Sequence, residues 1–553
     1  MEMKVPGKKR LHLAAVMLLV AATYSPILTY GFTNWDDPYF FYENQRLQHA
    51  FSMSPVQGLL EVINPGPAFA GKVVDWIPLR DVAAYLLGRT VGLKGQAIHG
   101  LELLFHLIST AMVFLIAIRL SSSVPAASFA ALFFGIHPAG VEVTAWAAEL
   151  KTAMGVGFGL SSLFLYMKAV ETTGRAYITN LLASLALATL SCLSSQYGVL
   201  VGFWVLLFDV AIRPSTRQTR RAGENKFFNQ RRIAAWAAFG ALSLAALAFH
   251  LKIRAVAGVF STWPAGTFEA TAGRTIKSLP LYVLNLALPV SLCPRQTIEP
   301  VLGFFDIGFW LGILTISAGI GVLAWSVKAR GRFLFLFLLG TSYLVPTLNL
   351  FPSTVIMADR YLYVPAAAMG IGIGLLADRL NSSGMISKKV LQLSMGALLA
   401  VFIALTFANV RTWRSSEALW TAVLDCSPGF FGAHHQLGML YFGQGQVQKA
   451  LPYFEEAARL APGNSIVHNS LGDAFHALSK IDKAENEYRM ARKTARNDLE
   501  LARAFNGLGL CAFARKDYKK ALGLFQKAEK LEPESRAFRK NLERANKALS
   551  SSF

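Results

Sequence analysis

The sequence predicts an all-α fold in two parts, a polytopic membrane domain over residues 1–409 and an α-solenoid of short repeats over residues 410–553. Hydrophobic residues make up 54% of the chain and charged residues only 16%, which is too little polar surface for a water-soluble globule of this size. Long apolar runs alternate with short polar breaks as far as the domain boundary. Beyond that boundary the composition is that of a soluble protein, and a Leu-Gly pair recurs at regular intervals.

Eleven segments are predicted to span the membrane, because a spanning helix needs about 20 mostly apolar residues. They are residues 11–30, 98–118, 125–141, 153–170, 178–193, 198–212, 232–251, 303–326, 333–351, 361–377 and 389–409. The segments 178–193 and 198–212 are short for a span. Residues 277–293 are predicted to form a re-entrant or interfacial element, because a twelfth span would place the basic cluster at residues 328–332 outside.

The distribution of basic residues predicts the orientation in an inner (cytoplasmic) membrane. The basic run at residues 8–10 predicts a cytoplasmic N-terminus. The first apolar stretch continues through Pro26 without a clear cleavage site, which favours a membrane anchor over a cleaved signal peptide. Eleven spans then put the basic loop at 213–232 inside and the chain after Arg411 in the periplasm or an equivalent lumen. Because such loops account for much of the net charge of +21, no nucleic-acid partner is predicted.

The C-terminal repeat is recognised from Gly438, Gly472 and Gly509, each preceded by Leu, at spacings of 34 and then 37 residues. Alanine and aromatic residues follow at the positions that tetratricopeptide (TPR) repeats use, since small residues let paired helices approach and aromatics fill the gap. The predicted repeats cover residues 431–464, 465–498 and 502–535, with a capping helix at 535–549. We expect a protein partner on the concave face of this stack. The alternative is that the stack only shapes or stabilises the membrane domain.

Two adjacent carboxylates, Asp36 and Asp37, directly follow the first span. Carboxylates beside hydrocarbon are costly unless they pair or function. A carboxylate at this place could act as a general base toward a hydroxyl acceptor. The alternative is a solvated Asp that caps a helix with Pro38 at its first position.

Further polar side chains recur at span ends predicted to lie on the same side of the membrane. They are His99, His106, His137, Glu142, Glu149, Lys151, Asp359 and Arg360. Individually each has a structural explanation, such as a bond to a neighbouring helix or an Asp359–Arg360 ion pair. Together they place acids, histidines and cations where a site for an anionic lipid-linked substrate needs them. No metal-ligand spacing, phosphate-cradling loop or nucleotide site is predicted, although the carboxylate pair leaves a divalent ion open.

The motifs, taken in chain order, resemble a known family. They are WDDP at residues 35–38, FFGIHPAGVEVTAW at 133–146, PTLN at 346–349 and ADRYLYVP at 358–365, followed by the TPR repeats. Over essentially its whole length the chain resembles the transmembrane-and-TPR-containing O-mannosyltransferase-like proteins and their bacterial relatives. These belong to the GT-C superfamily of polyprenyl-phosphate-sugar-dependent glycosyltransferases.

The resemblance implies an inverting transfer of sugar from a polyprenyl phosphate to a hydroxyl of a protein or envelope glycan, on the periplasmic or lumenal side. Asp36 or Asp37 would be the base, with a preference for Asp36 because it directly follows the aromatic residue. Arg360 or Lys151 would stabilise the phosphate that leaves. The TPR repeats would recruit the acceptor or a partner protein, and the lipid-linked sugar is a substrate rather than a cofactor.

The same resemblance assigns His137 and Glu142 to orienting the donor or acceptor. The chain also departs from the family pattern. Glu102 stands where relatives have Asn, and residues 194–196 read Ser-Ser-Gln where relatives often have Ser-Lys-Glu. These departures support an alternative, a non-catalytic membrane scaffold whose TPR repeats serve envelope assembly or secretion. A transporter is a third class, but neither mid-span charges nor repeated broken halves are clear in the sequence.

Overall fold

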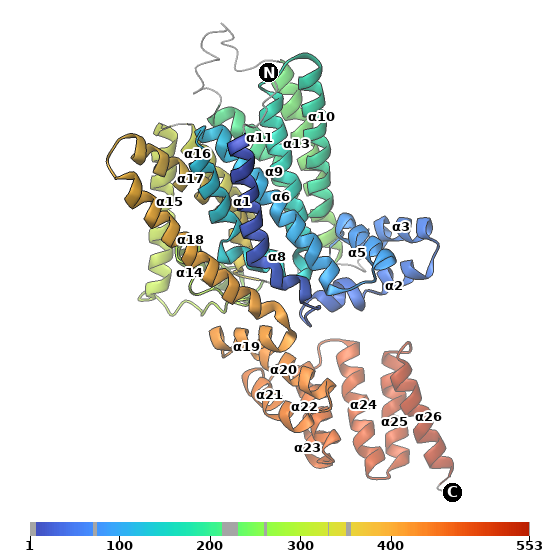
Figure 1. Cartoon of the computed structure of the whole chain (residues 1–553). Coiled ribbons are helices and arrows are strands. Elements are labelled where there is room, and N and C mark those ends of the chain that lie inside the picture. Colours follow the sequence, from blue (N-terminus) through green and yellow to red (C-terminus); the bar gives the residue numbers. More distant parts are fainter. Residues whose placement is uncertain are drawn as a thin grey trace. The chain divides into compact units, whose positions relative to one another are not determined.

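The structure, a computed structural model, describes residues 7–69, 75–212, 230–258, 263–329, 331–349 and 355–551. Contacts divide the chain into two compact units, Met1–Ser415 and Ser416–Phe553. Every regular element in the described residues is a helix, and no strand occurs among them (Figure 1). The all-α prediction of a membrane helical domain followed by a repeat solenoid is confirmed.

Unit 1 is a bundle of apolar helices, as expected where the backbone has no water to bond and must satisfy its own N–H and C=O groups. Its longer helices are α1 (Gly7–Tyr24), α6 (Gly95–Ser121), α7 (Val124–Gly135), α9 (Leu150–Ala169), α10 (Gly174–Ser194), α11 (Leu200–Ala211), α13 (Gln230–Val256), α14 (Phe268–Ala287), α15 (Ile307–Ala329), α16 (Arg332–Leu344), α17 (Tyr363–Ser382) and α18 (Lys388–Val410). Eight helical segments in the described residues are long and apolar enough to cross a membrane. Unit 1 is therefore a multi-pass membrane protein.

Each of the eleven predicted spans overlaps a helix, but the helices differ in length. A ninth span is possible as a bent pair, Val124–Gly135 with Pro138–Ala145, whose two parts meet at 52°. The predicted spans 198–212 and 333–351 correspond to shorter apolar helices, Gln196–Ala211 and Arg332–Thr347. The segment predicted as short at 178–193 is in fact the 21-residue helix α10.

The bend after α7 has a local cause at His137 and Pro138. Proline has no N–H to continue the helix, and it disfavours helical backbone at the residue before it. His137 accordingly has extended backbone angles, with φ −69° and ψ 125°. The chain then re-enters helix through η3 (Pro138–Gly140) and α8 (Val141–Ala145), which sets the direction of Glu142.

The predicted re-entrant or interfacial segment is occupied by α14 and the irregular chain that follows it. Helix α14 contains Pro280 and is not among the described helices that are apolar enough to cross. The basic loop at 213–232 lies outside the described residues as far as position 229. Position 330 of the second basic cluster also lies outside them.

The segment between α1 and α6 carries the carboxylate pair and is built from short helices. They are η1 (Ser25–Thr29), η2 (Pro38–Tyr42), α2 (Gln45–Ser52), α3 (Pro55–Ile63), α4 (Gly66–Phe69) and α5 (Pro78–Thr90). Helices α2, α3 and α5 pack against one another.

The centre of unit 1 is formed by α6, α7, α9 and α17, whose side chains are the most buried of the spans. Helices α7 and α17 approach closely because glycine lies at their contact, a usual device between membrane helices. A Cβ atom on Gly374 would meet the backbone oxygen of Ala126 at 2.6 Å.

Unit 2 is a row of helix pairs. Its helices are α19 (Ser416–Cys426), α20 (Phe431–Gly443), α21 (Val447–Leu460), α22 (Ser465–Ala477), α23 (Ile481–Thr494), α24 (Asp498–Ala514), α25 (Tyr518–Leu531) and α26 (Arg536–Ser550). Glycine of the first helix in a pair faces an aromatic ring of the second: a Cβ on Gly472 would lie 2.6 Å from the Tyr488 ring. The longer 37-residue spacing arises because α24 has 17 residues, whereas α20 and α22 have 13 each.

Candidate functional site

The two adjacent carboxylates have different surroundings, and Asp37 is the buried one. Its Oδ2 accepts hydrogen bonds from the backbone N–H (2.8 Å) and the hydroxyl (2.9 Å) of Thr33. Its Oδ1 accepts one from the backbone N–H of Ala148 at 3.1 Å. Burial raises the pKa of Asp37 to about 6, and the Thr33 hydrogen bonds oppose this rise. Both oxygens are occupied, so Asp37 fastens the segment after α1 to the turn before α9.

Asp36 is only half-buried, and its carboxylate makes no hydrogen bond with a described residue. Burial raises its pKa above the usual range, while the charges of Lys151 and Arg360 oppose that rise. Glu149 raises the pKa further, and Arg295 lowers it. Asp36 is thus a carboxylate with unused acceptor capacity, within electrostatic range of Lys151, Arg360 and Arg295.

Arg360 is held by two acids that come from different helices. Glu142 accepts a hydrogen bond from the Arg360 backbone N–H at 2.9 Å and forms an ion pair with Nη1 of its guanidinium. Oε1 of Glu149 lies 3.6 Å from Nε. The guanidinium carbon lies 5.5 Å from the centre of the Trp146 ring, within the range of a cation–π contact. The bend at His137-Pro138 is what brings Glu142 to this place.

Lys151 is the least engaged cation of the group. Its Nζ lies 3.7 Å from Oε1 of Glu149 and 5.4 Å from the centre of the Phe40 ring. Its ammonium group makes no hydrogen bond with a described residue, and the side chain is 20% exposed. An ammonium group has three donors. Lys151 therefore retains donors for an anionic ligand, whereas much of the charge of Arg360 is already balanced.

Three tryptophan rings lie beside these charges. The Trp35 ring is 5.2 Å from Trp146 and 6.2 Å from Trp413, and Trp146 and Trp413 stack at 5.5 Å. Trp413 belongs to η10 (Arg411–Arg414), the last element of unit 1. The chain therefore leaves unit 1 at the end of the bundle that carries Asp36.

The three histidines are engaged in the packing of the bundle. His99 bonds Glu102 through Nδ1 at 2.8 Å. His106 lies between the Tyr363 hydroxyl (2.6 Å) and the carbonyl of Gly135 (2.9 Å). His137 Nε2 lies 3.0 Å from the carbonyl oxygen of Leu286 in α14.

Asp359 is likewise fully engaged. It accepts hydrogen bonds from the side-chain amide of Asn285 at 3.0 Å and from the backbone N–H of Cys293 at 2.9 Å. Its partner is therefore not Arg360, and the structural ion pair considered from the sequence does not form. Asp359 holds the chain after α14, and Arg360 turns toward the acids.

The structure thus separates the predicted site residues into two sets. Asp36, Glu142, Glu149, Lys151 and Arg360 form one charged group. Asp37, His99, His106, His137 and Asp359 each make buried hydrogen bonds that join helices or turns. In the described part of the chain, no group of three or more His, Cys, Asp or Glu side chains is arranged to hold a metal ion.

Sequence reasoning missed Arg295 and the role of Trp413. Arg295 lies in irregular chain after α14 and acts on the pKa of Asp36. No local pattern marks an arginine in a loop as a neighbour of a carboxylate some 260 residues earlier. Trp413 could have been suspected, because an aromatic residue directly after a span is typical of the membrane interface.

Two family models named tetratricopeptide repeat match residues 430–497 and 502–535. Human protein O-mannosyl-transferase TMTC3 is 21% identical over 435 residues, which is 74% of this chain and 47% of the relative. Tmtc1 of Drosophila melanogaster, also named protein O-mannosyl-transferase, is 34% identical over 122 residues, 20% of this chain and 14% of the relative. The resemblance drawn from the motifs is confirmed, although the chain spans about half the length of the TMTC3 relative.

Among solved structures, ArnT from Cupriavidus metallidurans, bound to undecaprenyl phosphate, matches 94% of this chain and 89% of its own. The identity is 12% and the TM-score 0.35, which is too low to relate the two folds.

Proposed function

We propose that the chain is a membrane glycosyltransferase that moves a sugar from a polyprenyl-phosphate donor to a hydroxyl acceptor on the periplasmic or lumenal side. The observation that carries the proposal is Asp36, whose carboxylate makes no hydrogen bond with a described residue and lies within electrostatic range of Lys151 and Arg360. A base and a phosphate-binding cation are the two groups that this transfer needs. The relatives named O-mannosyl-transferase support the same class of reaction.

The proposed chemistry is a single displacement. Asp36 takes the proton of the acceptor hydroxyl, and the acceptor oxygen attacks the anomeric carbon of the sugar. The bond from that carbon to the phosphate oxygen breaks, and the polyprenyl phosphate leaves with the electron pair. Attack from the face opposite the leaving group inverts the anomeric configuration. The donors of Lys151 stabilise the charge that develops on the phosphate.

The other charged residues position Asp36 and Lys151. Glu149 lies near both Lys151 and Arg360, so it fixes the cations relative to each other. Glu142 fixes Arg360, and Asp37 fixes the backbone that carries Asp36. His137 supports the site from a distance by holding α14 to the bend after α7.

A non-catalytic scaffold is the second candidate, and the pairing of Arg360 favours it. A guanidinium that is balanced by Glu142 and Glu149 is what a purely structural ion network would contain. The Asp36 carboxylate has no place in such a network, since it makes no hydrogen bond with a described residue.

The test is transfer by the full chain in lipid nanodiscs, using radiolabelled sugars on polyprenyl phosphate and a panel of hydroxyl acceptors. Nucleotide sugars serve as control donors. We expect product from at least one polyprenyl-phosphate sugar and none from the nucleotide sugars. Absence of product across the panel would contradict the enzyme and favour the scaffold.

A further inference from the structure

The chain between α14 and α15 exposes four large apolar side chains, which we call the apolar turn. Leu302 is 83% exposed, Phe304 74%, Phe305 91% and Ile307 75%. The rings of Phe304 and Phe305 lie edge to face, with their centres 5.6 Å apart. Single exposed apolar residues are common on proteins, whereas a contiguous apolar patch marks an interaction site.

An ion pair holds the backbone of the apolar turn from inside. Asp306 accepts hydrogen bonds from the backbone N–H groups of Leu302 and Phe309, each at 3.0 Å. Lys277 of α14 donates to Oδ2 of Asp306 at 2.8 Å and to the carbonyl oxygen of Pro300 at 3.0 Å. The Asp306 side chain is 6% exposed and that of Lys277 15%. The charges therefore point into the protein, while the apolar side chains point out of it.

Further polar groups of this backbone are paired within the turn. The Gly303 carbonyl oxygen accepts a hydrogen bond from the Asp306 N–H at 3.2 Å. The Trp310 indole N–H donates to the Phe304 carbonyl oxygen at 2.6 Å. Backbone groups that approach hydrocarbon must find partners inside the protein, whereas a loop in water can use water instead. This pairing therefore favours lipid over water as the surroundings of the turn.

The apolar turn leads directly into a helix that faces lipid. Helix α15 begins at Ile307 and is long and apolar enough to cross a membrane, and only 6% of its apolar stretch is buried within the protein. A Cβ atom on Gly312 would collide with the carbonyl oxygen of Ile276, so α15 lies close against α14. The start of a spanning helix lies at a membrane surface, where large aromatic side chains concentrate. The residues just before α15 lie at the same level.

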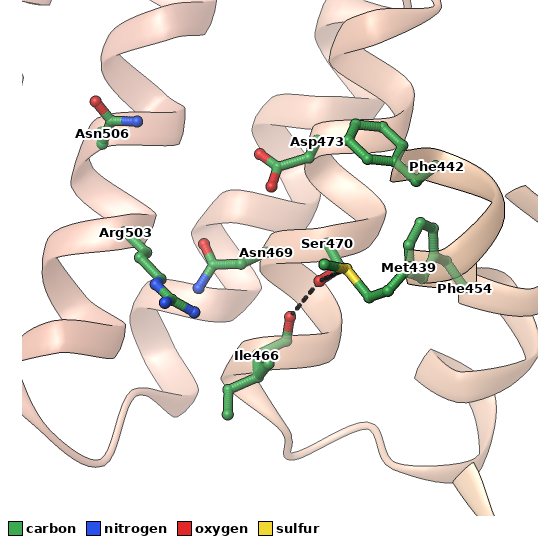
Figure 2. A pocket seen from close by; sticks show the side chains of 9 residues that line it. All are labelled: Met439, Phe442, Phe454, Ile466, Asn469, Ser470, Asp473, Arg503 and Asn506. Atoms are coloured by element: carbon green, nitrogen blue, oxygen red, sulfur yellow. Dashed lines mark hydrogen bonds between the residues drawn. The ribbon is translucent and has the colours of Figure 1, made fainter. Parts of the chain in front are cut away.

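The TPR solenoid provides an apolar surface of a different kind. A hollow of about 300 Å³ over α20, α22 and α24 is lined by Met439 and Ile466, but also by Asp473 and Arg503 (Figure 2). Met439 is 42% and Ile466 40% exposed. Every member of the apolar turn is more exposed than these two, and no charged side chain is exposed beside it within residues 300–310.

We propose that the apolar turn inserts into the lipid leaflet beside α15, with its side chains among the acyl chains and the Asp306–Lys277 pair at the level of the headgroups. The turn then fixes the depth of α14 in the membrane. Helix α14 bonds Asp359 through Asn285, next to Arg360 of the charged group. That this depth serves a phosphate on a membrane lipid rests on the proposed function. Insertion itself does not.

The experiment is photochemical cross-linking of the full chain in nanodiscs of phosphatidylethanolamine and phosphatidylglycerol. The photoreactive residue p-benzoylphenylalanine replaces Phe305, a position so exposed that folding tolerates the change. Mass spectrometry after illumination identifies each adduct and the part of the lipid that carries it. We expect phospholipid adducts on the acyl chains. The same probe at Ile466 in the solenoid is the matched control and should give at least tenfold fewer.

A charge in the apolar turn gives a second measurement. Phe304→Asp, in the chain that carries the probe at position 305, should lower the yield of acyl-chain adducts at least threefold, because a carboxylate opposes insertion. Phe304→Leu is its control and should keep the yield. Position 304 is exposed, so neither change disturbs the core.

Four results would overturn the inference: adducts to protein alone, adducts confined to lipid headgroups, a yield at position 305 no higher than at 466, or an unchanged yield in Phe304→Asp. Adducts to protein alone would show that a partner protein covers the turn. Sugar transfer is not part of the readout. Lipid adducts without transfer would leave this inference standing and contradict only the proposed enzyme.

Discussion

Asp36 and Asp37 show how two identical side chains acquire different roles from their surroundings. The Asp37 carboxylate accepts three hydrogen bonds, one of them from the backbone N–H of Ala148. The Asp36 carboxylate makes no hydrogen bond with a described residue, and it lies within electrostatic range of cations from α9 and η9 (Asp359–Leu362). The sequence predicted that the pair is functional, but it could not show that the surroundings of the two carboxylates differ. The deciding partner of Asp37 lies 111 residues away along the chain.

Lys151 gives a prediction at the residue scale. Lys151→Ala should lower the rate of transfer about 10- to 100-fold at saturating donor, because it removes donors that act on the charge developing at the phosphate. The matched control is Lys168→Ala at the other end of α9, where the side chain is exposed. Steady-state kinetics with a polyprenyl-phosphate sugar measures the transfer rates of both variants. Transfer by Lys151→Ala within twofold of the wild type would remove this residue from the mechanism.

At the scale of elements, the sequence located the helices well and their ends less well. The length of the apolar runs located all eight described helices that are long and apolar enough to cross a membrane, and the Leu-Gly pairs located the solenoid repeats. The bend between α7 and α8 was not predicted as a bend, because residues 125–141 look like one uninterrupted apolar run. The structure breaks that run at Pro138, and Glu142 reaches Arg360 only because of the break.

The repeat glycines give a prediction at the element scale. Gly472→Ala should destabilise α22 and α23 by about 1–3 kcal/mol, because the added methyl group would lie 2.6 Å from the Tyr488 ring. Gly523→Ala in α25 is the control. A Cβ there meets nothing within 4 Å, so it should stabilise its helix by about 0.5–1 kcal/mol. Hydrogen exchange of the full chain, read by mass spectrometry, reports both values. Unchanged protection of α22 in Gly472→Ala would show that this packing is not tight.

At the scale of the whole molecule, the question is which side of the membrane the TPR repeats occupy. Counting spans gives an answer that one miscounted helix reverses. The contact of Trp413 with Trp35 is a second argument, and it does not depend on the number of spans. Residue 413 lies at the same end of unit 1 as Asp36, and unit 2 begins at Ser416. We therefore infer that the repeats lie on the side where the proposed chemistry takes place.

A topology measurement checks this inference. A reporter inserted at Gly445, in the turn between α20 and α21, should report the same side as one inserted in the exposed segment near Val56. A reporter within the basic loop at 213–229 should report the opposite side, since basic loops stay in the cytoplasm. Cytoplasmic signals from Gly445 together with periplasmic signals near Val56 would contradict the assignment.

The most direct test of the account is the transfer rate of Asp36→Asn. General base catalysis contributes about 10²- to 10⁴-fold, so the variant should lose at least 100-fold in rate while its thermal stability stays that of the wild type. Glu43→Gln, an exposed carboxylate in the same segment, should transfer normally. Asp37→Asn should instead lower the stability, because the amide puts an N–H group where a backbone N–H now donates. An Asp36→Asn variant that transfers sugar as fast as the wild type would contradict the central claim.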